Sequence, residues 1–559
     1  LRSPIQFHHR VKTISVKNHT DVLIKEAGMK TIYYDGDIIT MTGAKDSCEA
    51  LVTKDKKILY TGTLKQARTL YGNEAQERDL KGHTLMPAFI DAHSHFVQTA
   101  QSIKMCDLSD TESFEDIVTA LKNYLEKNQI DENGMIFATG YDHNFLAEQK
   151  HPDKTVLDKV SKTVPIYISH ASGHMGVANS ALLKLAGITT ETKDPEGGRF
   201  GRDKSGEPDG YVEETPALMQ VLAAAMPRMK MDMAEQMKEA QQLYLKYGIT
   251  TVQEGAAMAQ TMQGLTAFAA SGGLELDVVA YILKEDYEKT VKEYADYNGK
   301  YKNRVKIGGV KVILDGSPQG KSAWLSKPYE GEENYCGYPT HNDAYVTKAA
   351  KDAVRGGYQI LAHCNGDAAS EQFIQSYQAA LKETGTADGD YRPVMIHCQT
   401  VRDDQLDRMA QLKMIPSIFI GHTYYWGDIH LKNLGAVRGA RISPVKSALE
   451  RGLIYNFHQD TPVTKPDMLH SVWCAVNRVT RKGQPIGQEQ CINVYEALQA
   501  VTINAAYAYK EEDQKGTLEA GKMADMVILD ANPLKADKKY IKDIVVLETI
   551  KEGKTVYKN

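Results

Sequence analysis

Two histidines, one residue apart, follow a short apolar run near the start of the chain. In FIDAHSHF, residues 89–96, His93 and His95 come after a segment that is typical of a buried strand. Imidazole nitrogens are common ligands of zinc and similar divalent ions. Where the chain leaves the regular pleat of a strand, both rings can reach one ion. For either histidine alone, the alternative is an ordinary hydrogen-bonded residue at a strand end.

Other residues of metal-ligand type occupy similar positions later in the chain. The apolar runs YQILAHC, YRPVMIHC and LIYNFHQD carry His363, His397 and Asp460 at or just beyond their ends. Any one of them could be structural, but a series of such donors in order, each at an apolar strand end, is better explained by a shared site. We therefore predict a site for one or two divalent ions, and zinc suits this set of nitrogen and oxygen donors.

A repeated unit of helix, stop and apolar strand would position these donors. In MAEQMKEAQQLYLKYGITTVQEG, Met237 and Tyr244 share one helical face, Gly248 ends the helix, and a strand then runs to Glu254. Helices that alternate with wholly apolar strands are typical of a parallel sheet covered by helices. We predict an α/β fold with a (β/α)8 TIM-like barrel over residues 86–505, in which the carboxyl ends of the strands carry the chemistry.

Both ends of the chain are rich in short strands. Residues 29–85 and 506–559 contain alternating runs separated by turns, and they predict one small β-sandwich domain built from both termini. Residues 1–28 are interpreted as an N-terminal extension, with an arm of the fold as the alternative. Residues 100–230 form an insertion with its own helix starting at Ser113. We expect this insertion to lie over the barrel mouth and to shape the pocket.

Composition limits the classes of partner. The net charge of -5 and the isoelectric point near 6.4 supply no cationic field for nucleic acid or anionic lipid. The seven cysteines form no CxxC pair, which favours a reducing compartment. No apolar run approaches the roughly 18 residues that span a bilayer. We expect a cytoplasmic protein with a small-molecule substrate and with no nucleic-acid or membrane partner, and a homo-oligomer is left open.

Ordered motifs along the chain resemble the amidohydrolase superfamily. MPAFIDAHSH is similar to the first-strand motif of that superfamily, with Ala88 where glycine is usual. More specifically, TGYDHNFL, VPIYISHASGHMGVANSALLKLAGI, DPEGGRFGRDKSGEPDGYVEE and KVILDGSPQGKSAWL resemble amidohydrolase family 3, which includes N-substituted formamide deformylases and YtcJ-like proteins. The resemblance extends over residues 30–555. It implies a metal-dependent amidohydrolase and says less about the substrate.

The resemblance also implies a lysine ligand. Lys311 lies inside the apolar run GGVKVILDG, where the family pattern points to an N6-carboxylysine that bridges two metal ions. A carbamate would supply two anionic oxygens, whereas a protonated ammonium would repel the ions. The alternative is an ordinary lysine paired with Asp315 or Glu254.

The predicted reaction is hydrolysis of a non-peptide carbon-nitrogen bond of the amide type, in an N-acyl or N-formyl amine. A metal-activated hydroxide would attack the carbonyl, with Asp460 as the general base. His174 would stabilise the oxyanion or orient the substrate, with a structural role as the alternative. Tyr141, Trp324 and His422 are predicted to bind substrate, although aromatic side chains are more often part of a core.

Departures from the family pattern lie close to the predicted site. His458 and Gln459 stand where Gly-Ser is usual before Asp460, and DGSPQGKSAWL is altered as well. These changes put substrate preference in doubt more than the hydrolytic chemistry. A mononuclear-metal deaminase of an aminated heterocycle is one alternative, but HCNGD offers Asp367 where a deaminase would carry a glutamate. A catalytically inactive binding or regulatory protein is the other.

Overall fold

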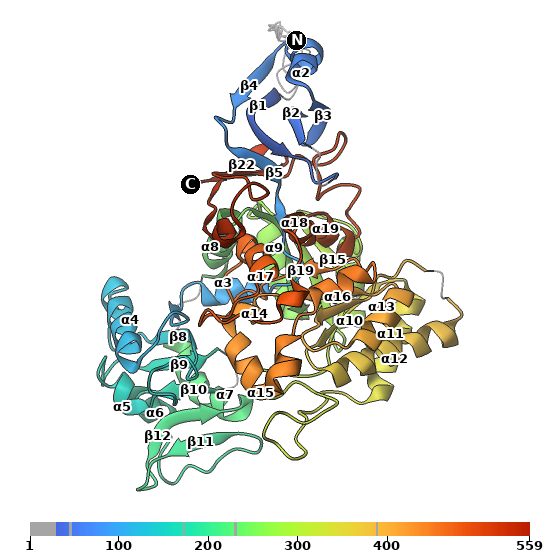
Figure 1. The fold of residues 1–559 in the computed structure, drawn as a ribbon. Coiled ribbons are helices and arrows are strands. Elements are labelled where there is room, and N and C mark those ends of the chain that lie inside the picture. The colour runs from blue at the N-terminus through green and yellow to red at the C-terminus, as the bar shows by residue number, and fades with distance from the viewer. Residues whose placement is uncertain (1–28, 44–46, 172, 174, 229–231, 387–388) are drawn as a thin grey trace, which may run out of the picture.

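Three sheets organise the part of the chain that the computed structural model describes, which is residues 29–43, 47–171, 173, 175–228, 232–386 and 389–559 (Figure 1). One sheet is built from the two ends of the chain, one forms the barrel, and one belongs to the insertion. Residues 1–28, interpreted above as an extension, lie outside the described residues.

The terminal sheet combines strands from both ends of the chain. Its strands are β1 (Lys30–Ile39), β2 (Ser47–Lys54), β3 (Lys57–Gly62), β4 (Ala75–Asp79), β5 (Thr84–Pro87), β20 (Met526–Leu529), β21 (Val546–Lys551) and β22 (Lys554–Lys558). Strand β5 pairs antiparallel with β20, which joins the N-terminal strands to the C-terminal ones. Helix α2 (Leu64–Tyr71) packs on it through Ala67. A β-sandwich would also need a second sheet packed on this one, and that part of the expected fold stays a prediction.

Eight parallel strands form the barrel sheet. In spatial order they are β19 (Asn456–Phe457), β18 (Ile415–Ile418), β17 (Val394–His397), β16 (Gln359–Cys364), β15 (Val305–Ile313), β14 (Asp277–Leu283), β13 (Ile249–Ala257) and β6 (Phe89–Ile90). Beyond the two edge strands, the amide of His95 donates to the carbonyl of Thr461 at 2.8 Å, and the amide of Asp460 donates to the carbonyl of His93 at 3.2 Å. The two edges therefore meet, as the predicted TIM-like barrel requires.

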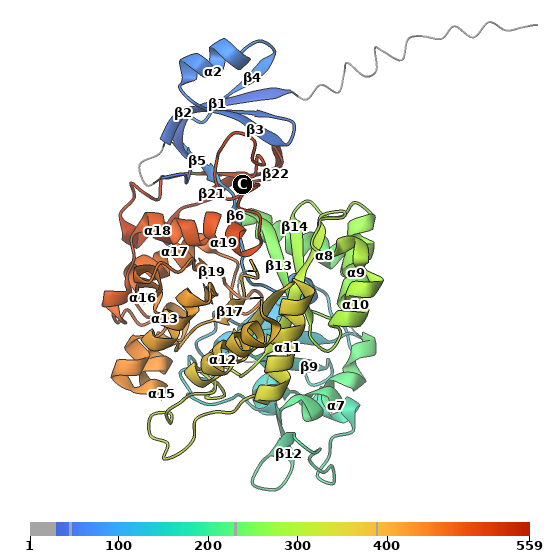
Figure 2. The same ribbon diagram turned by 90° about the vertical axis from the view of Figure 1, so that its right-hand side faces the viewer.

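Helices surround the barrel strands (Figure 2). They are α3 (Phe96–Ser102), α8 (Met233–Lys246), α9 (Ala259–Ala270), α10 (Tyr287–Glu293), α11 (Asp343–Gly356), α12 (Asp367–Thr384), α13 (Asp403–Gln411), α14 (His422–Tyr425), α15 (Gly427–Ala440), α16 (Val445–Glu450), α17 (Met468–Asn477), α18 (Val494–Ala500) and α19 (Ile503–Ala508). In α8 the face predicted from Met233, Met237, Ala240 and Tyr244 is buried except at Met233, which is partly buried, and Gly248 follows with φ +78°. Among the described helices, none is long and apolar enough to cross a bilayer.

The insertion folds around its own six-stranded sheet. Its elements are β7 (Cys106–Asp107), α4 (Phe114–Lys127), β8 (Ile136–Tyr141), α5 (Lys154–Leu157), β9 (Ile166–His170), β10 (Met175–Ala178), α6 (Ser180–Ala186), β11 (Arg199–Arg202), β12 (Pro208–Glu213) and α7 (Thr215–Ala225). Both views place it at the end of the barrel away from the terminal sheet. Because β5 of the terminal sheet leads directly into β6, that distant end is the one where the barrel strands finish.

A buried ion cluster joins the barrel to the terminal sheet. The carboxylate of Asp277, at the start of β14, lies 2.6 Å from Nζ of Lys551 in β21 and 2.7 Å from Nζ of Lys515. Arg304 approaches its other oxygen at 3.1 Å, and Lys551 also contacts Asp525 at 2.7 Å. Burial raises the pKa of Asp277, but the two lysines outweigh burial and hold that pKa far below its ordinary value.

Candidate metal centre

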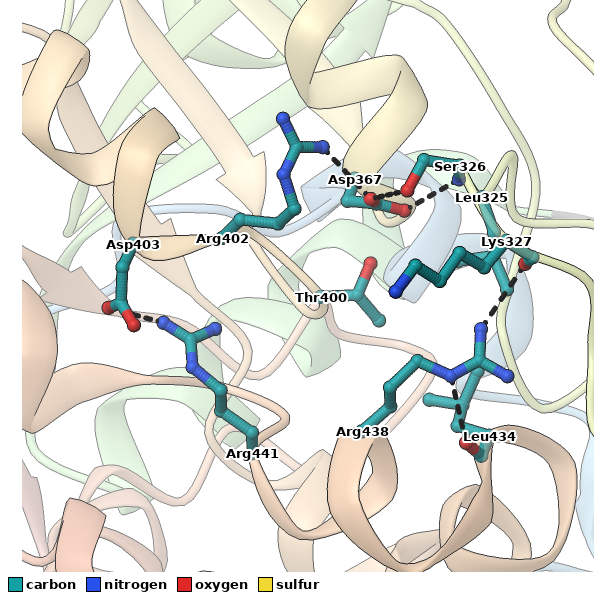
Figure 3. Close-up of a pocket in the computed structure, with 10 residues that line it drawn as sticks. All are labelled: Leu325, Ser326, Lys327, Asp367, Thr400, Arg402, Asp403, Leu434, Arg438 and Arg441. Carbon is teal, nitrogen blue, oxygen red and sulfur yellow. Dashed lines mark hydrogen bonds and ion pairs between the residues drawn. The ribbon is translucent and has the colours of Figure 1, made fainter.

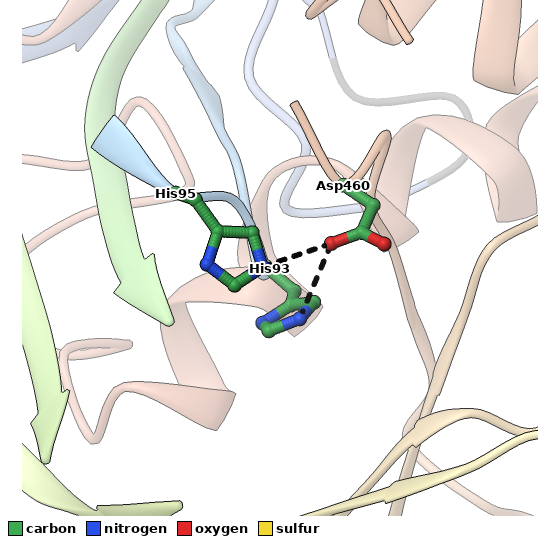
Figure 4. A group of neighbouring side chains, drawn as sticks. All are labelled: His93, His95 and Asp460. Atoms are coloured by element: carbon green, nitrogen blue, oxygen red, sulfur yellow. Dashed lines mark ion pairs between the residues drawn. The ribbon is translucent and has the colours of Figure 1, made fainter. Parts of the chain in front are cut away.

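His93, His95 and Asp460 converge at the carboxyl end of the barrel (Figure 4). The two histidines follow β6, and Asp460 follows β19, the other edge strand. Nε2 of His95 lies 3.2 Å from Oδ1 of Asp460, and Nε2 of His93 lies 3.4 Å from the same oxygen. The closure of the barrel thus brings together residues that are far apart in the sequence.

The geometry of this group fits a divalent ion. Oδ1 of Asp460 is buried and has no hydrogen-bond partner among the described residues, which is costly for a carboxylate oxygen. A tetrahedral ion with bonds of about 2.0 to 2.2 Å holds its ligand atoms about 3.3 to 3.6 Å apart. The separations of 3.2 and 3.4 Å between the histidine nitrogens and this oxygen are close to that spacing. A zinc-like ion between them would satisfy the unpartnered oxygen.

The other predicted donors lie beside this group. Nζ of Lys311 is 3.4 Å from Nε2 of His93, and Nε2 of His397 is 4.0 Å from Oδ2 of Asp460. The ring of His363 lies 4.5 Å from that of His397 between centroids. Burial lowers the pKa of Lys311 to about 8. The structure therefore brings all six predicted ligand residues into one cluster.

The far ring nitrogen of His93 is held by Gln253. The amide of Gln253 donates through Nε2 to the carbonyl of Ala92 at 2.8 Å and to the hydroxyl of Tyr509 at 3.1 Å. Its Oε1 is therefore the acceptor, and it lies 2.5 Å from Nδ1 of His93. Nδ1 of His93 then carries the proton, and Nε2 presents its lone pair to the cluster with Asp460.

His363 and His397 have comparable partners. Nδ1 of His363 is 3.1 Å from Oδ1 of Asp315, and Nδ1 of His397 is 3.2 Å from Nε2 of His458. Nδ1 of His458 is in turn 2.9 Å from Oγ of Ser417. Burial lowers the pKa of His397 well below its usual range and that of His458 to about 3, so both rings are neutral at pH 7. Neutral imidazole is the form that binds a metal ion.

Sequence reasoning assigned no supporting role to Gln253 or His458. His458 follows β19 directly, so its position at a strand end was an available signal, whereas Gln253 lies in the middle of β13. Asp315, offered above as a partner of Lys311, instead accepts from His363. Glu254, the other candidate partner, accepts from the amide of Val97 at 2.7 Å.

Two predicted substrate-binding residues lie near the cluster. His422 is buried, with Nδ1 3.0 Å from Nε2 of His430, and its ring lies 4.6 Å from that of Phe419. Trp324 is partly buried, and its amide donates to Asp315 at 3.0 Å, so it adjoins the residue that holds His363.

The remaining predicted substrate and catalytic residues belong to the insertion. Tyr141 is buried there, and its hydroxyl lies 3.0 Å from Nδ1 of His151. His174, predicted to stabilise the oxyanion, lies outside the described residues.

A pocket of about 230 Å³ is lined in part by Asp367 and Thr400, which come shortly after β16 and β17 (Figure 3). Its charged lining residues are Lys327, Asp367, Arg402, Asp403, Arg438 and Arg441. Arg402 pairs with Asp367 at 2.9 Å and Arg441 with Asp403 at 2.6 Å, so part of the positive charge is neutralised within the lining. The predicted metal donors do not line it.

The chain is similar to known proteins over almost its whole length. The model of the amidohydrolase family matches residues 76–557. YtcJ of Bacillus subtilis (strain 168) is 25% identical over 541 residues, which is 95% of this chain and 99% of that protein. The N-substituted formamide deformylase of Arthrobacter pascens is 24% identical over 95% of this chain and 97% of its own. A metal-dependent hydrolase from Pyrococcus horikoshii OT3 aligns with a TM-score of 0.73 at 25% identity, over 91% of this chain and 99% of the other.

Proposed function

Because the chain belongs to the amidohydrolase family, we propose that it is a metal-dependent hydrolase of a non-peptide, amide-type carbon-nitrogen bond. The proposed substrate is an N-acyl or N-formyl amine, and the similarity to an N-substituted formamide deformylase supports this class. The observation that carries the proposal is the buried, unpartnered oxygen of Asp460 beside the nitrogens of His93 and His95.

The proposed ligands are the six clustered donors, which would hold one or two divalent ions. They are His93, His95, Lys311, His363, His397 and Asp460. When bound, a zinc-like ion supplies Lewis acidity, which polarises a carbonyl and lowers the pKa of water.

Asp460 is the proposed general base. Its Oδ1 faces the nitrogens of His93 and His95 as the proposed metal ligand, which leaves Oδ2 of the same carboxylate for the proton. It would take a proton from the attacking water and give it to the departing amine. Gln253 and His458 would support this step indirectly, because each holds the far nitrogen of a ligand histidine.

Lys311 is the proposed bridging ligand, as N6-carboxylysine. Its amine is buried 3.4 Å from Nε2 of His93, where an ammonium would oppose a bound cation. We expect protein prepared with ¹³C-bicarbonate to show a carbamate carbon resonance that Lys311→Arg lacks. Lys306→Arg is the matched control, since Lys306 is a buried lysine on the same strand whose ammonium pairs with Glu511. A wild-type protein without that resonance would contradict the bridge.

A hydrolysis screen tests the proposed reaction. The panel contains N-formyl amines, N-acyl amines, carbamates and cyclic amides, each with added zinc. We expect turnover in an amide-type class, loss of that turnover with a chelator and recovery on adding metal. Ammonia release from aminated heterocycles alone would favour a deaminase. Fewer than about one tightly bound divalent ion per chain would remove the basis of the proposal.

A further inference from the structure

The insertion contains a second group of metal-ligand residues. Asp142 and His143 follow β8, and His170 ends β9. The two strands are parallel neighbours, and Tyr141 is the register partner of His170. The carboxyl ends of the strands therefore place all three side chains at one edge of the insertion sheet.

The donor atoms of this group lie within 3.8 Å of one another, and two of the histidine nitrogens are within hydrogen-bonding distance. Nδ1 of His143 lies 3.1 Å from Nε2 of His170. Oδ1 of Asp142 lies 3.4 Å from that nitrogen of His170 and 3.8 Å from Nδ1 of His143. Bonds of about 2.0 to 2.2 Å to one tetrahedral ion would place such atoms about 3.3 to 3.6 Å apart. An ion could therefore reach all three with small side-chain adjustments.

Neighbouring groups hold these donors in place. The backbone amide and the side-chain amide of Asn144 both donate to Oδ1 of Asp142 at 2.9 Å. The ring of His151 lies 4.0 Å from that of His143 between centroids. Hydrogen-bonded carboxylates and packed rings are common behind metal ligands, because they fix the direction of the donor atoms.

Burial also suits this group to an ion. Asp142 is 5% exposed and His170 is 6% exposed, whereas 29% of the His143 side chain is open to solvent. The open side would admit an ion and leave room for water as a further ligand.

We propose that Asp142, His143 and His170 form a second divalent-metal site, separate from the barrel centre. Two imidazoles and one carboxylate suit zinc, cobalt or nickel, whereas calcium and magnesium prefer oxygen ligands throughout. An ion there would tie the end of β8 to the end of β9.

Equilibrium dialysis of the full chain against buffered zinc, followed by metal analysis, tests the proposal. We expect Asp142→Asn and His143→Gln each to bind about one zinc ion fewer than the wild type. Asp142→Asn preserves the shape of the side chain, and His143→Gln changes a partly exposed one, so the two variants carry different risks to folding. His341→Gln is the control, because His341 stacks on Tyr345 at the start of α11, outside the insertion, and it should match the wild type.

A second background separates the two sites. In His95→Asn, which impairs the barrel site, cobalt absorption from the insertion site should remain and should disappear when Asp142→Asn is added. Equal zinc content in the wild type and both insertion variants would overturn the proposal. So would cobalt absorption in the His95→Asn background that survives the loss of Asp142.

Discussion

Asp460→Asn should lower kcat/KM about 100- to 10,000-fold on the amide substrate that the screen identifies. Asparagine has nearly the same shape as aspartate, but it cannot accept the proton from water. The neutral side chain also leaves His93 and His95 without the carboxylate that faces them at 3.4 and 3.2 Å. The measurement is steady-state kinetics at saturating zinc, with bound metal determined on the same samples.

Asp367→Asn is the control for this substitution. Asp367 also lies at the carboxyl end of a barrel strand, but it pairs with Arg402 in the lining of the neighbouring pocket. Its loss should change kcat/KM only a few-fold. A fall in kcat with metal retained in Asp460→Asn would identify the base, and a fall that follows the loss of metal would identify a ligand. Full turnover would rule out both roles.

Asp277→Asn should destabilise the protein by about 3 to 5 kcal/mol, because it removes a carboxylate that two buried lysines and Arg304 share. Lys551 is only 1% exposed at its side chain, and Lys515 is 6% exposed. Their ammonium groups would keep their desolvation cost and lose a shared partner. The measurement is the free energy of unfolding in urea, with unfolding monitored separately in the barrel and in the terminal sheet.

An exposed ion pair gives the control for Asp277. Asp296 pairs with Lys302 at 2.7 Å, and its side chain is 70% exposed, so solvent screens the pair and Asp296→Asn should leave the unfolding midpoint almost unchanged. The cations hold the pKa of Asp277 far below its ordinary value. The stability that the Asp277 carboxylate contributes is therefore fully present at neutral pH, and it is lost only as the pH falls into the strongly acidic range. Equal urea midpoints for Asp277→Asn and Asp296→Asn would show that the Asp277 cluster adds no stability.

The barrel could be predicted because its signal is repeated and local. The strands that carry His363 and His397 near their ends are mostly apolar and buried, as strands covered on both faces must be. Helix α4 is another local case: it begins at Ser113 as its N-cap, as predicted, and Ser113 accepts from the amide of Asp116 at 3.1 Å. In a capping box the side chain of Asp116 would also accept from the amide of Ser113. Here it accepts from the amide of Glu112 instead.

The partners of the ligand histidines could not be predicted, because they depend on tertiary register. Gln253 lies 160 residues from His93, and nothing local marks its amide as the group that fixes that ring. His458 is separated from His397 by 61 residues. In the sequence it stands out only as a departure from the family pattern, and its orienting contact exists only because β17, β18 and β19 are neighbours.

The closure of the barrel also sets the point during synthesis at which the predicted metal donors can come together. His95 bonds to Thr461 and His93 lies against Asp460, so the earliest and the latest donors sit on the two edges that meet. A ribosome makes the chain from the N-terminus, so His93 and His95 emerge hundreds of residues before their carboxylate partner. A nascent chain that has not reached Asp460 carries an incomplete set of donors. The complete set of predicted donors can therefore come together only after the last barrel strand has been made.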